Sequence, residues 1–173
     1  MKRTKVGPFD YAIQVEKAIP KGVLLTTKAD DKVNSMVIGW GMLGTIWSIP
    51  TFVTFVRTSR YTHELLAANP RFTINVPVDG PLPRDIFRVC GTQSGRDVDK
   101  VSAAALELVE GEKVDVPAIV QAPLTLECEV MYHTPLDESA IPEDLHDRYY
   151  VQDTDGLHDV YYGRIVSSYL LEA

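Results

Sequence analysis

Short apolar runs separated by turn-forming residues dominate the hydrophobic pattern of this chain. Residues 22–28 and 33–40 are rich in β-branched side chains and flank the turn sequence at 29–32, which predicts an antiparallel hairpin. Residues 51–56 are apolar or β-branched throughout, so we expect a strand buried on both faces in the middle of a barrel or sandwich. Further strands are predicted at residues 71–76, 124–133 and 159–171.

Helical patterns are fewer and shorter. Thr62 is a candidate N-cap for a helix over residues 63–69, because its hydroxyl can accept from a free backbone N–H, and Pro70 ends this helix. Other short helices are predicted at residues 84–89 and 143–147, and residues 102–109 fit a short helix or a turn. Residues 11–19 have a mixed periodicity that fits a strand or a short helix. Residues 41–49 contain two glycines and are expected to form a loop.

The order of these elements predicts the fold class. Many short strands and a few short helices, without a regular β-α-β rhythm, are typical of a mostly β, antiparallel barrel. A chain of 173 residues is long enough for one sizeable core, so we expect a single domain over residues 1–173. The acidic connection at residues 135–156 is long for a compact domain, which indicates a functional segment or a contact with another subunit.

Composition excludes several classes of function. The net charge of −7 argues against a sequence-independent nucleic-acid binder, which needs a basic surface. No segment approaches the roughly 20 apolar residues of a membrane span, and the basic N-terminus leads into no apolar signal core, so a cytoplasmic protein without membrane contact is expected. Cys90 and Cys128 lie far apart in the sequence, which argues against a disulfide framework.

The polar corner RTSRYT at residues 57–62 is the strongest candidate for chemistry. It combines two guanidinium groups, Arg57 and Arg60, with the hydroxyls of Ser59 and Thr62 and the exposed N–H groups of the helix that follows. This donor set suits a phosphate, and a basic cluster in an acidic protein indicates a local site for a small anion. The same residues equally fit a capped helix with solvated arginines, and the residues alone do not separate these interpretations.

Three segments together resemble the FMN-binding split-barrel family of flavin reductase-like proteins, and its flavoredoxin-like branch most closely. They are NSMVIGWG at residues 34–41, RTSRYT at residues 57–62 and CGTQSGRDVDK at residues 90–100. A weaker match is DVYYGRIV at residues 159–166, and the order and spacing agree over nearly the whole chain. The resemblance implies a split barrel, usually a homodimer, with FMN bound near the subunit interface.

The resemblance also implies the residues that bind the flavin. Arg57, Ser59, Arg60 and Thr62 would hold the phosphate, and the sequence does not decide which arginine makes the contact. The other implied residues, which would line the flavin, are Asn34, Ser35, Met36, Trp40, Cys90, Ser94, Lys100 and His133. An ammonium near the reduced flavin, such as that of Lys100, would raise its reduction potential.

Each of these residues has a simpler interpretation from the residues alone. Asn34 and Ser35 follow a turn, where polar residues are ordinarily turn chemistry. Trp40 fits a core tryptophan, Lys100 fits a solvated surface lysine, and lone histidines such as His133 are seldom functional. Cys90 fits a small buried hydrophobe. Trp47 is expected in the core or in a dimer contact.

Other chemistry lacks a recognisable pattern. Residues 90–96 lack the Gly-Lys-Ser/Thr ending of a nucleotide P-loop, and no Gly-x-Gly-x-x-Gly fingerprint or nucleophile elbow occurs. The four histidines, His63, His133, His146 and His158, show no paired ligand spacing, so no metal site is predicted. No catalytic residue is assigned.

Three functions fit this sequence. The leading hypothesis is an FMN-dependent oxidoreductase that passes electrons from NAD(P)H or a protein donor through FMN to an acceptor. The second is a non-catalytic flavin-binding electron carrier or storage protein. The third is a split barrel that has lost flavin and acts through its dimer surface. The sequence does not identify the donor, the acceptor or the preference between NADH and NADPH.

Overall fold

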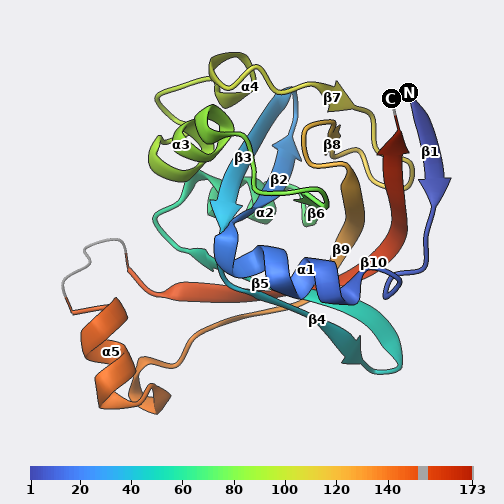
Figure 1. Cartoon of the computed structure of the whole chain (residues 1–173). Coiled ribbons are helices and arrows are strands. Elements are labelled where there is room, and N and C mark those ends of the chain that lie inside the picture. The colour runs from blue at the N-terminus through green and yellow to red at the C-terminus, as the bar shows by residue number, and fades with distance from the viewer. Residues whose placement is uncertain (152–155, 173) are drawn as a thin grey trace.

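The fold is an antiparallel β-barrel with short helices around it (Figure 1), as predicted. The computed structural model describes residues 1–151 and 156–172. One sheet runs in the order β3-β2-β6-β9-β10-β5-β4, with β1 paired to β10, and every pairing in it is antiparallel. Its strands are β1 (Lys2–Lys5), β2 (Val23–Ala29), β3 (Lys32–Ile38), β4 (Gly41–Ile46), β5 (Ile49–Arg57), β6 (Arg71–Val76), β9 (Leu124–Pro135) and β10 (His158–Glu172).

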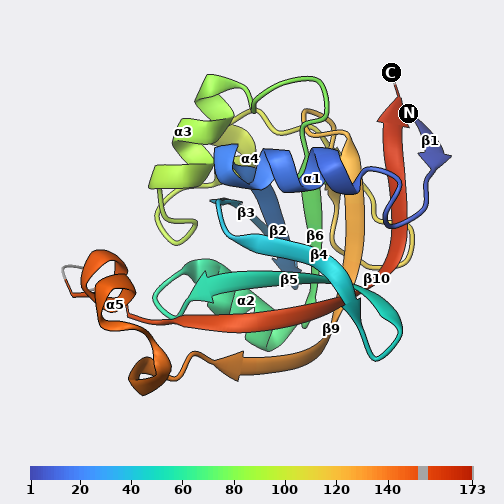
Figure 2. The same ribbon diagram turned by 60° about the horizontal axis from the view of Figure 1, so that its bottom comes forward.

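The helices lie around the sheet and do not separate its strands (Figure 2). α3 and α4 pack beside β3, and α2 packs against β2, β3 and β5. The helices are α1 (Ala12–Ala18), α2 (Tyr61–Ala68), α3 (Arg84–Thr92), α4 (Lys100–Ala103) and α5 (Glu143–Tyr149), with 3₁₀ helices at Ile19–Lys21 and Glu138–Ala140. A small second sheet pairs β7 (Leu108–Val109) with β8 (Ala118–Ile119). No helix in the described ranges is long and apolar enough to cross a membrane.

The strongest strand patterns are confirmed. β2 and β3 form the predicted hairpin, with Val23 opposite Ile38 and Ala29 opposite Lys32. β5 lies between β10 and β4, and the side chains of Phe52 and Val56 are fully buried, in agreement with its continuous apolar pattern. Strand β1 was not predicted.

The expected loop at residues 41–49 is wrong, because most of it forms the edge strand β4. Gly41 suits this strand, since a Cβ there would lie 2.9 Å from the ring of Phe52 on β5. Trp47 occupies the turn after β4 with a positive φ of 51° and is 64% exposed, so of its two expected places, the core or a dimer contact, the core is wrong. The glycines indicated a loop, but here Gly41 allows close packing against β5.

Several predicted helix boundaries also differ. Residues 12–18 are helical. α2 begins at Tyr61 with Arg60 as N-cap and no side-chain cap bond, so Thr62 is not the cap. The hydroxyl of Thr62 accepts instead from Nδ2 of Asn34 at 2.9 Å. The helix or turn predicted at residues 102–109 is displaced, since α4 ends at Ala103, a turn follows, and residues 108–109 form β7.

The two largest of three apolar clusters among the described residues hold this arrangement together. The larger fills the barrel and includes Phe52, Phe72 and Tyr161. The smaller packs α3 and α4 onto the outside of β2 through Leu24 and Val89. Burial of each large apolar side chain contributes about 1.5–3 kcal/mol, which fixes the helices that border the cavities described below.

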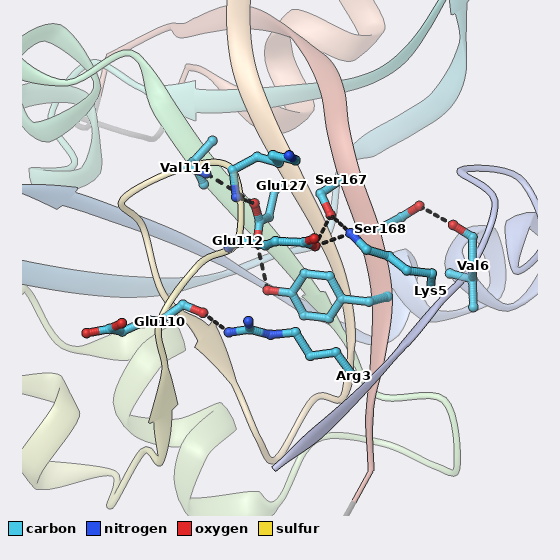
Figure 3. Close-up of polar contacts among 11 residues, drawn as sticks. Arg3, Lys5, Val6, Glu110, Glu112, Val114, Glu127, Ser167 and Ser168 are labelled. Atoms are coloured by element: carbon cyan, nitrogen blue, oxygen red, sulfur yellow. Dashed lines mark hydrogen bonds and ion pairs between the residues drawn. The ribbon is translucent and has the colours of Figure 1, made fainter.

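Glu127 is a fully buried carboxylate on β9 that holds the segment 110–114 against the barrel (Figure 3). Its two oxygens accept from the backbone N–H groups of Glu112 (2.6 Å), Lys113 (2.6 Å) and Val114 (3.1 Å), and from the hydroxyl of Tyr169 (2.7 Å). Lys5 pairs with Glu112 at the edge of this network. Because every oxygen of Glu127 faces donors, its charge is well compensated inside the protein.

Candidate cofactor-binding site

Two adjoining cavities lie between β3, the end of β5 and the segment that joins α3 to α4. Their volumes are about 330 Å³ and 320 Å³, within the range of small-molecule sites. The first cavity extends along β3 to Trp40 and Phe55, and the second lies at the start of α2. Both are lined by Met36, Arg60, Gln93, Ser94 and Lys100. These shared walls make the two cavities parts of one elongated site.

The corner between β5 and α2 supplies donors to this site. Arg60 lines both cavities, and Ser59 lines the second. The hydroxyl oxygen of Ser59 is buried and has no hydrogen-bond partner within the described part of the chain. A buried hydroxyl normally has a partner, so a ligand oxygen fits this position. The start of α2, which carries no side-chain cap, adds backbone N–H groups suited to an anion.

Arg57 faces a different set of partners. Its guanidinium donates to the backbone carbonyls of Tyr149 (3.1 Å) and Gly156 (2.9 Å), although it also lines the first cavity. The ring of Trp40 lies edge-on to Tyr149 and is tilted against His158, with ring centres 5.2 Å and 4.8 Å away. The predicted excursion at residues 135–156 therefore contacts the barrel at the rim of the cavity through Tyr149 and Gly156, while its residues 152–155 lie outside the described part of the chain.

Lys100 is a buried cation at the wall between the two cavities. Its ammonium donates to the backbone carbonyls of Ser35 (3.1 Å) and Cys90 (3.2 Å) and is 4% exposed as a residue. Burial lowers the pKa of Lys100, the Cys90 thiol acts in the opposite direction, and the positive charge of Arg60 lowers it further. The simpler interpretation of Lys100 as a solvated surface residue is wrong.

The segment 93–97 closes the second cavity against the corner. Arg96 donates to the carbonyl of Ser59 at 2.8 Å and pairs with the carboxylate of Glu64. Gly95 lies directly over the side chain of Asn34, since a Cβ on Gly95 would lie 2.1 Å from the amide oxygen of Asn34. Only a glycine allows this approach, which explains its place in the motif.

The structure brings most of the predicted binding residues together. Those that line the cavities are Asn34, Met36, Trp40, Arg57, Ser59, Arg60, Thr62, Cys90, Ser94 and Lys100. Cys90 lies within α3, and burial raises the pKa of its thiol, while Lys100 lowers it by a smaller amount. Ser35 points elsewhere: its hydroxyl bonds to Thr26 at 3.0 Å, and only its carbonyl reaches Lys100.

His133, like Ser35, lies outside both cavities. Its Nε2 bonds to Oδ2 of Asp159 at 2.7 Å, and Nε2 of His63 bonds to the same oxygen at 2.8 Å. Burial acts to raise the pKa of Asp159, but the hydrogen bonds and charge of the two imidazoles outweigh it and lower this pKa. Within this chain, therefore, His133 belongs to a separate cluster.

The lining residues that were not predicted include Phe55, Gln93, Arg96 and His158. Gln93 and Arg96 lie inside the motif at residues 90–100, so their place in the motif was a usable signal. His158 lines the cavity because its register opposite Arg57 directs both residues to the same face of the sheet. That relation requires the pairing of β10 with β5, which sequence periodicity does not reveal.

The fold and the site define a class, a split barrel with an elongated cavity that has basic and hydroxyl side chains at one end and apolar and aromatic side chains at the other. The chain belongs to the family of the flavin reductase like domain, whose sequence model matches residues 17–173. This membership confirms the resemblance found in the three motifs.

Individual relatives agree with this assignment. An uncharacterized protein of Archaeoglobus fulgidus is 32% identical over 68% of this chain, and the match spans 64% of that protein. Flavoredoxin from Methanosarcina acetivorans is 28% identical with a TM-score of 0.64, covering 87% of this chain and 68% of that one. An FMN-binding domain of a flavin reductases-like enzyme from Shewanella baltica has a TM-score of 0.70 at 18% identity, covers 98% of this chain and 77% of its own, and supports the fold.

Proposed function

We propose that this protein is an FMN-binding flavoprotein oxidoreductase. The observation that carries the proposal is the elongated site, in which the donor-rich corner at Arg60 and the buried ammonium of Lys100 lie beside apolar and aromatic side chains. Bound FMN would supply the redox chemistry, taking electrons from a donor and passing them to an acceptor. The side chains of the protein bind it, orient it and exclude water.

The two ends of the site suit the two ends of FMN. Ser59, Arg60 and the first N–H groups of α2 would hold the phosphate, because a dianion needs both cationic charge and several donors. Met36, Trp40 and Phe55 offer the apolar surface that a flat ring system requires. We assign the phosphate contact to Arg60 because Arg60 lines both cavities, including the one at the start of α2, whereas Arg57 lines only the first.

Lys100 would tune the bound flavin. Its ammonium is held by two carbonyls, so its position is fixed before the cofactor binds. Reduction places negative charge on the flavin, and a fixed cation nearby stabilises that state and raises the reduction potential. This role requires no proton transfer from Lys100.

A homodimer is part of the proposal. The barrel exposes large apolar side chains near β4, with Met42 51%, Trp47 64% and Tyr132 47% exposed. The rings of Trp47 and Tyr132 contact each other at 6.5 Å between centres. Clustered exposed aromatic residues are typical of a protein interface, so a second copy of this chain would cover them.

A flavin-binding electron carrier is the second candidate. It is favoured by the 28% identity to a protein named flavoredoxin from Methanosarcina acetivorans. In that case a protein donor, and not a nicotinamide, would reduce the bound flavin. The same site residues would bind FMN in both functions.

Anaerobic mixing separates the two candidates. We expect NADH or NADPH to bleach the visible band of the FMN-loaded protein faster than that of free FMN at equal concentration. If dithionite bleaches the bound flavin while neither nicotinamide exceeds the protein-free blank, the carrier function replaces the enzymatic one. Stopped-flow absorbance provides the rates.

A further inference from the structure

We infer that His63, His133 and Asp159 form a binding site for a divalent transition metal of the zinc type. The three ligand atoms lie within 4.8 Å of one another. The residues come from three different elements: His63 from α2, His133 from β9 and Asp159 from β10. No metal was predicted from the sequence, because the ligands are far apart along the chain and no local spacing rule joins them.

The hydrogen bonds in this structure already bring the two histidine nitrogens to one carboxylate oxygen. Nε2 of His63 and Nε2 of His133 both approach Oδ2 of Asp159, at 2.8 Å and 2.7 Å. Both imidazoles must therefore donate, and a cation bound among the three atoms would replace the two shared protons. In a tetrahedral zinc site neighbouring ligand atoms lie about 3.3 Å apart, so each Nε2–Oδ2 distance needs to lengthen by roughly half an ångström. The two Nε2 atoms, which lie within 4.8 Å of each other, need to settle near the same separation.

Burial and packing suit a site with fixed ligands and an open side. The Asp159 side chain is 9% exposed, while His63 is 26% and His133 42% exposed. The ring of His133 stacks on Tyr161 with centres 4.5 Å apart, which orients the imidazole. Two histidines and one buried carboxylate, with solvent on the exposed side, leave a coordination position for water.

The ligand set selects the class of metal. Two neutral imidazoles and one carboxylate carry a charge of −1, which complements a dication. Nitrogen ligands favour zinc and other first-row transition ions, whereas magnesium and calcium require sites built from oxygen. We therefore expect Zn²⁺ to bind and Mg²⁺ not to compete at equal concentration.

This metal site is distinct from the proposed flavin site. Asp159 follows His158 on β10, and successive residues of a strand point to opposite faces. His158 lines the first cavity, whereas none of the three metal ligands lines either cavity. The inference therefore stands whether or not the protein binds FMN.

Isothermal titration of the metal-stripped protein with ZnCl₂ tests the inference. We expect one Zn²⁺ per chain, and we expect His133→Gln and His63→Gln each to weaken binding by roughly 100-fold or more, since even groups that only support a ligand are worth about 10- to 100-fold. His146→Gln is the matched control and should bind like the parent. His146 is a comparable surface histidine on α5 that bonds a carboxylate, Glu138, at 2.8 Å.

Two results would overturn the inference. One is the absence of zinc binding by the parent protein, and the other is one-to-one binding that survives the double change at His63 and His133. A zinc-edge anomalous map of a soaked crystal gives a readout that needs no variant. It should show a peak about 2.0–2.2 Å from both Nε2 atoms and an oxygen of Asp159, and a peak at another place counts against the site.

Discussion

Replacing Arg60 with alanine should weaken FMN binding by roughly 10- to 100-fold, because a charge-assisted hydrogen bond to a phosphate contributes about 1.5–3 kcal/mol. Riboflavin lacks the phosphate, so its affinity should change little in the same variant. The ratio of the two affinities, measured by quenching of flavin fluorescence, isolates the phosphate contact from any general damage to the site.

Two other arginines serve as comparisons. Arg164 lies on β10, and its exposed guanidinium pairs with Glu129 at 2.9 Å. Arg164→Ala should leave the affinities for FMN and riboflavin unchanged. Arg57→Ala should affect FMN and riboflavin alike, since Arg57 holds the carbonyls of Tyr149 and Gly156 at the rim. If Arg57→Ala weakens the binding of FMN more than that of riboflavin, and Arg60→Ala does not, the phosphate contact belongs to Arg57.

Replacing Glu127 with glutamine should destabilise the protein by about 3–5 kcal/mol, since it leaves part of a buried hydrogen-bond network unmatched. Both carboxylate oxygens accept from buried donors, and an amide would turn one acceptor into a donor that faces another donor. The free energy of unfolding from urea denaturation measures the effect. The loss should be accompanied by increased hydrogen exchange in the segment 110–114.

Glu129→Gln is the matched control for this change. Glu129 lies two residues further along β9 on the same face, but its side chain is 30% exposed and pairs with Arg164 and Arg71. A surface pair of this kind contributes about 0–1 kcal/mol, so the control should be nearly neutral. If the two substitutions lower the free energy of unfolding equally, the hydrogen bonds around Glu127 contribute no more to stability than the surface pairs of Glu129.

The sequence predicted those strands whose burial produces a simple pattern of apolar residues. The continuous apolar run of residues 51–56 identified β5, and the turn at residues 29–32 identified the β2-β3 hairpin. Strand β4 was missed because Gly41 and Gly44 indicate a loop, although Gly41 instead makes room for Phe52. Local composition therefore failed where a close tertiary contact decided the conformation.

The candidate site was predictable where its residues lie in motifs. The corner at residues 57–62 and the segment 90–100 meet across one elongated site, as the resemblance implied. By contrast, the cluster of His63, His133 and Asp159 depends on the pairing of β9 with β10 and on the packing of α2, which no sequence spacing records.

Buried polar residues show the same limit. Glu127 and Glu129 are the same residue type at the same phase of β9, yet one is fully buried and the other is partly exposed. The difference comes from the segment 110–114, which covers Glu127 and supplies its donors. Strand periodicity assigns both to one face but cannot say which part of that face another segment will cover.

The retention of FMN tests the central claim most directly. After incubation with FMN and removal of free ligand by desalting, the protein should be yellow and should carry one FMN per chain by its visible absorption spectrum. A colourless protein that also shows no saturable flavin binding in titration would contradict the account.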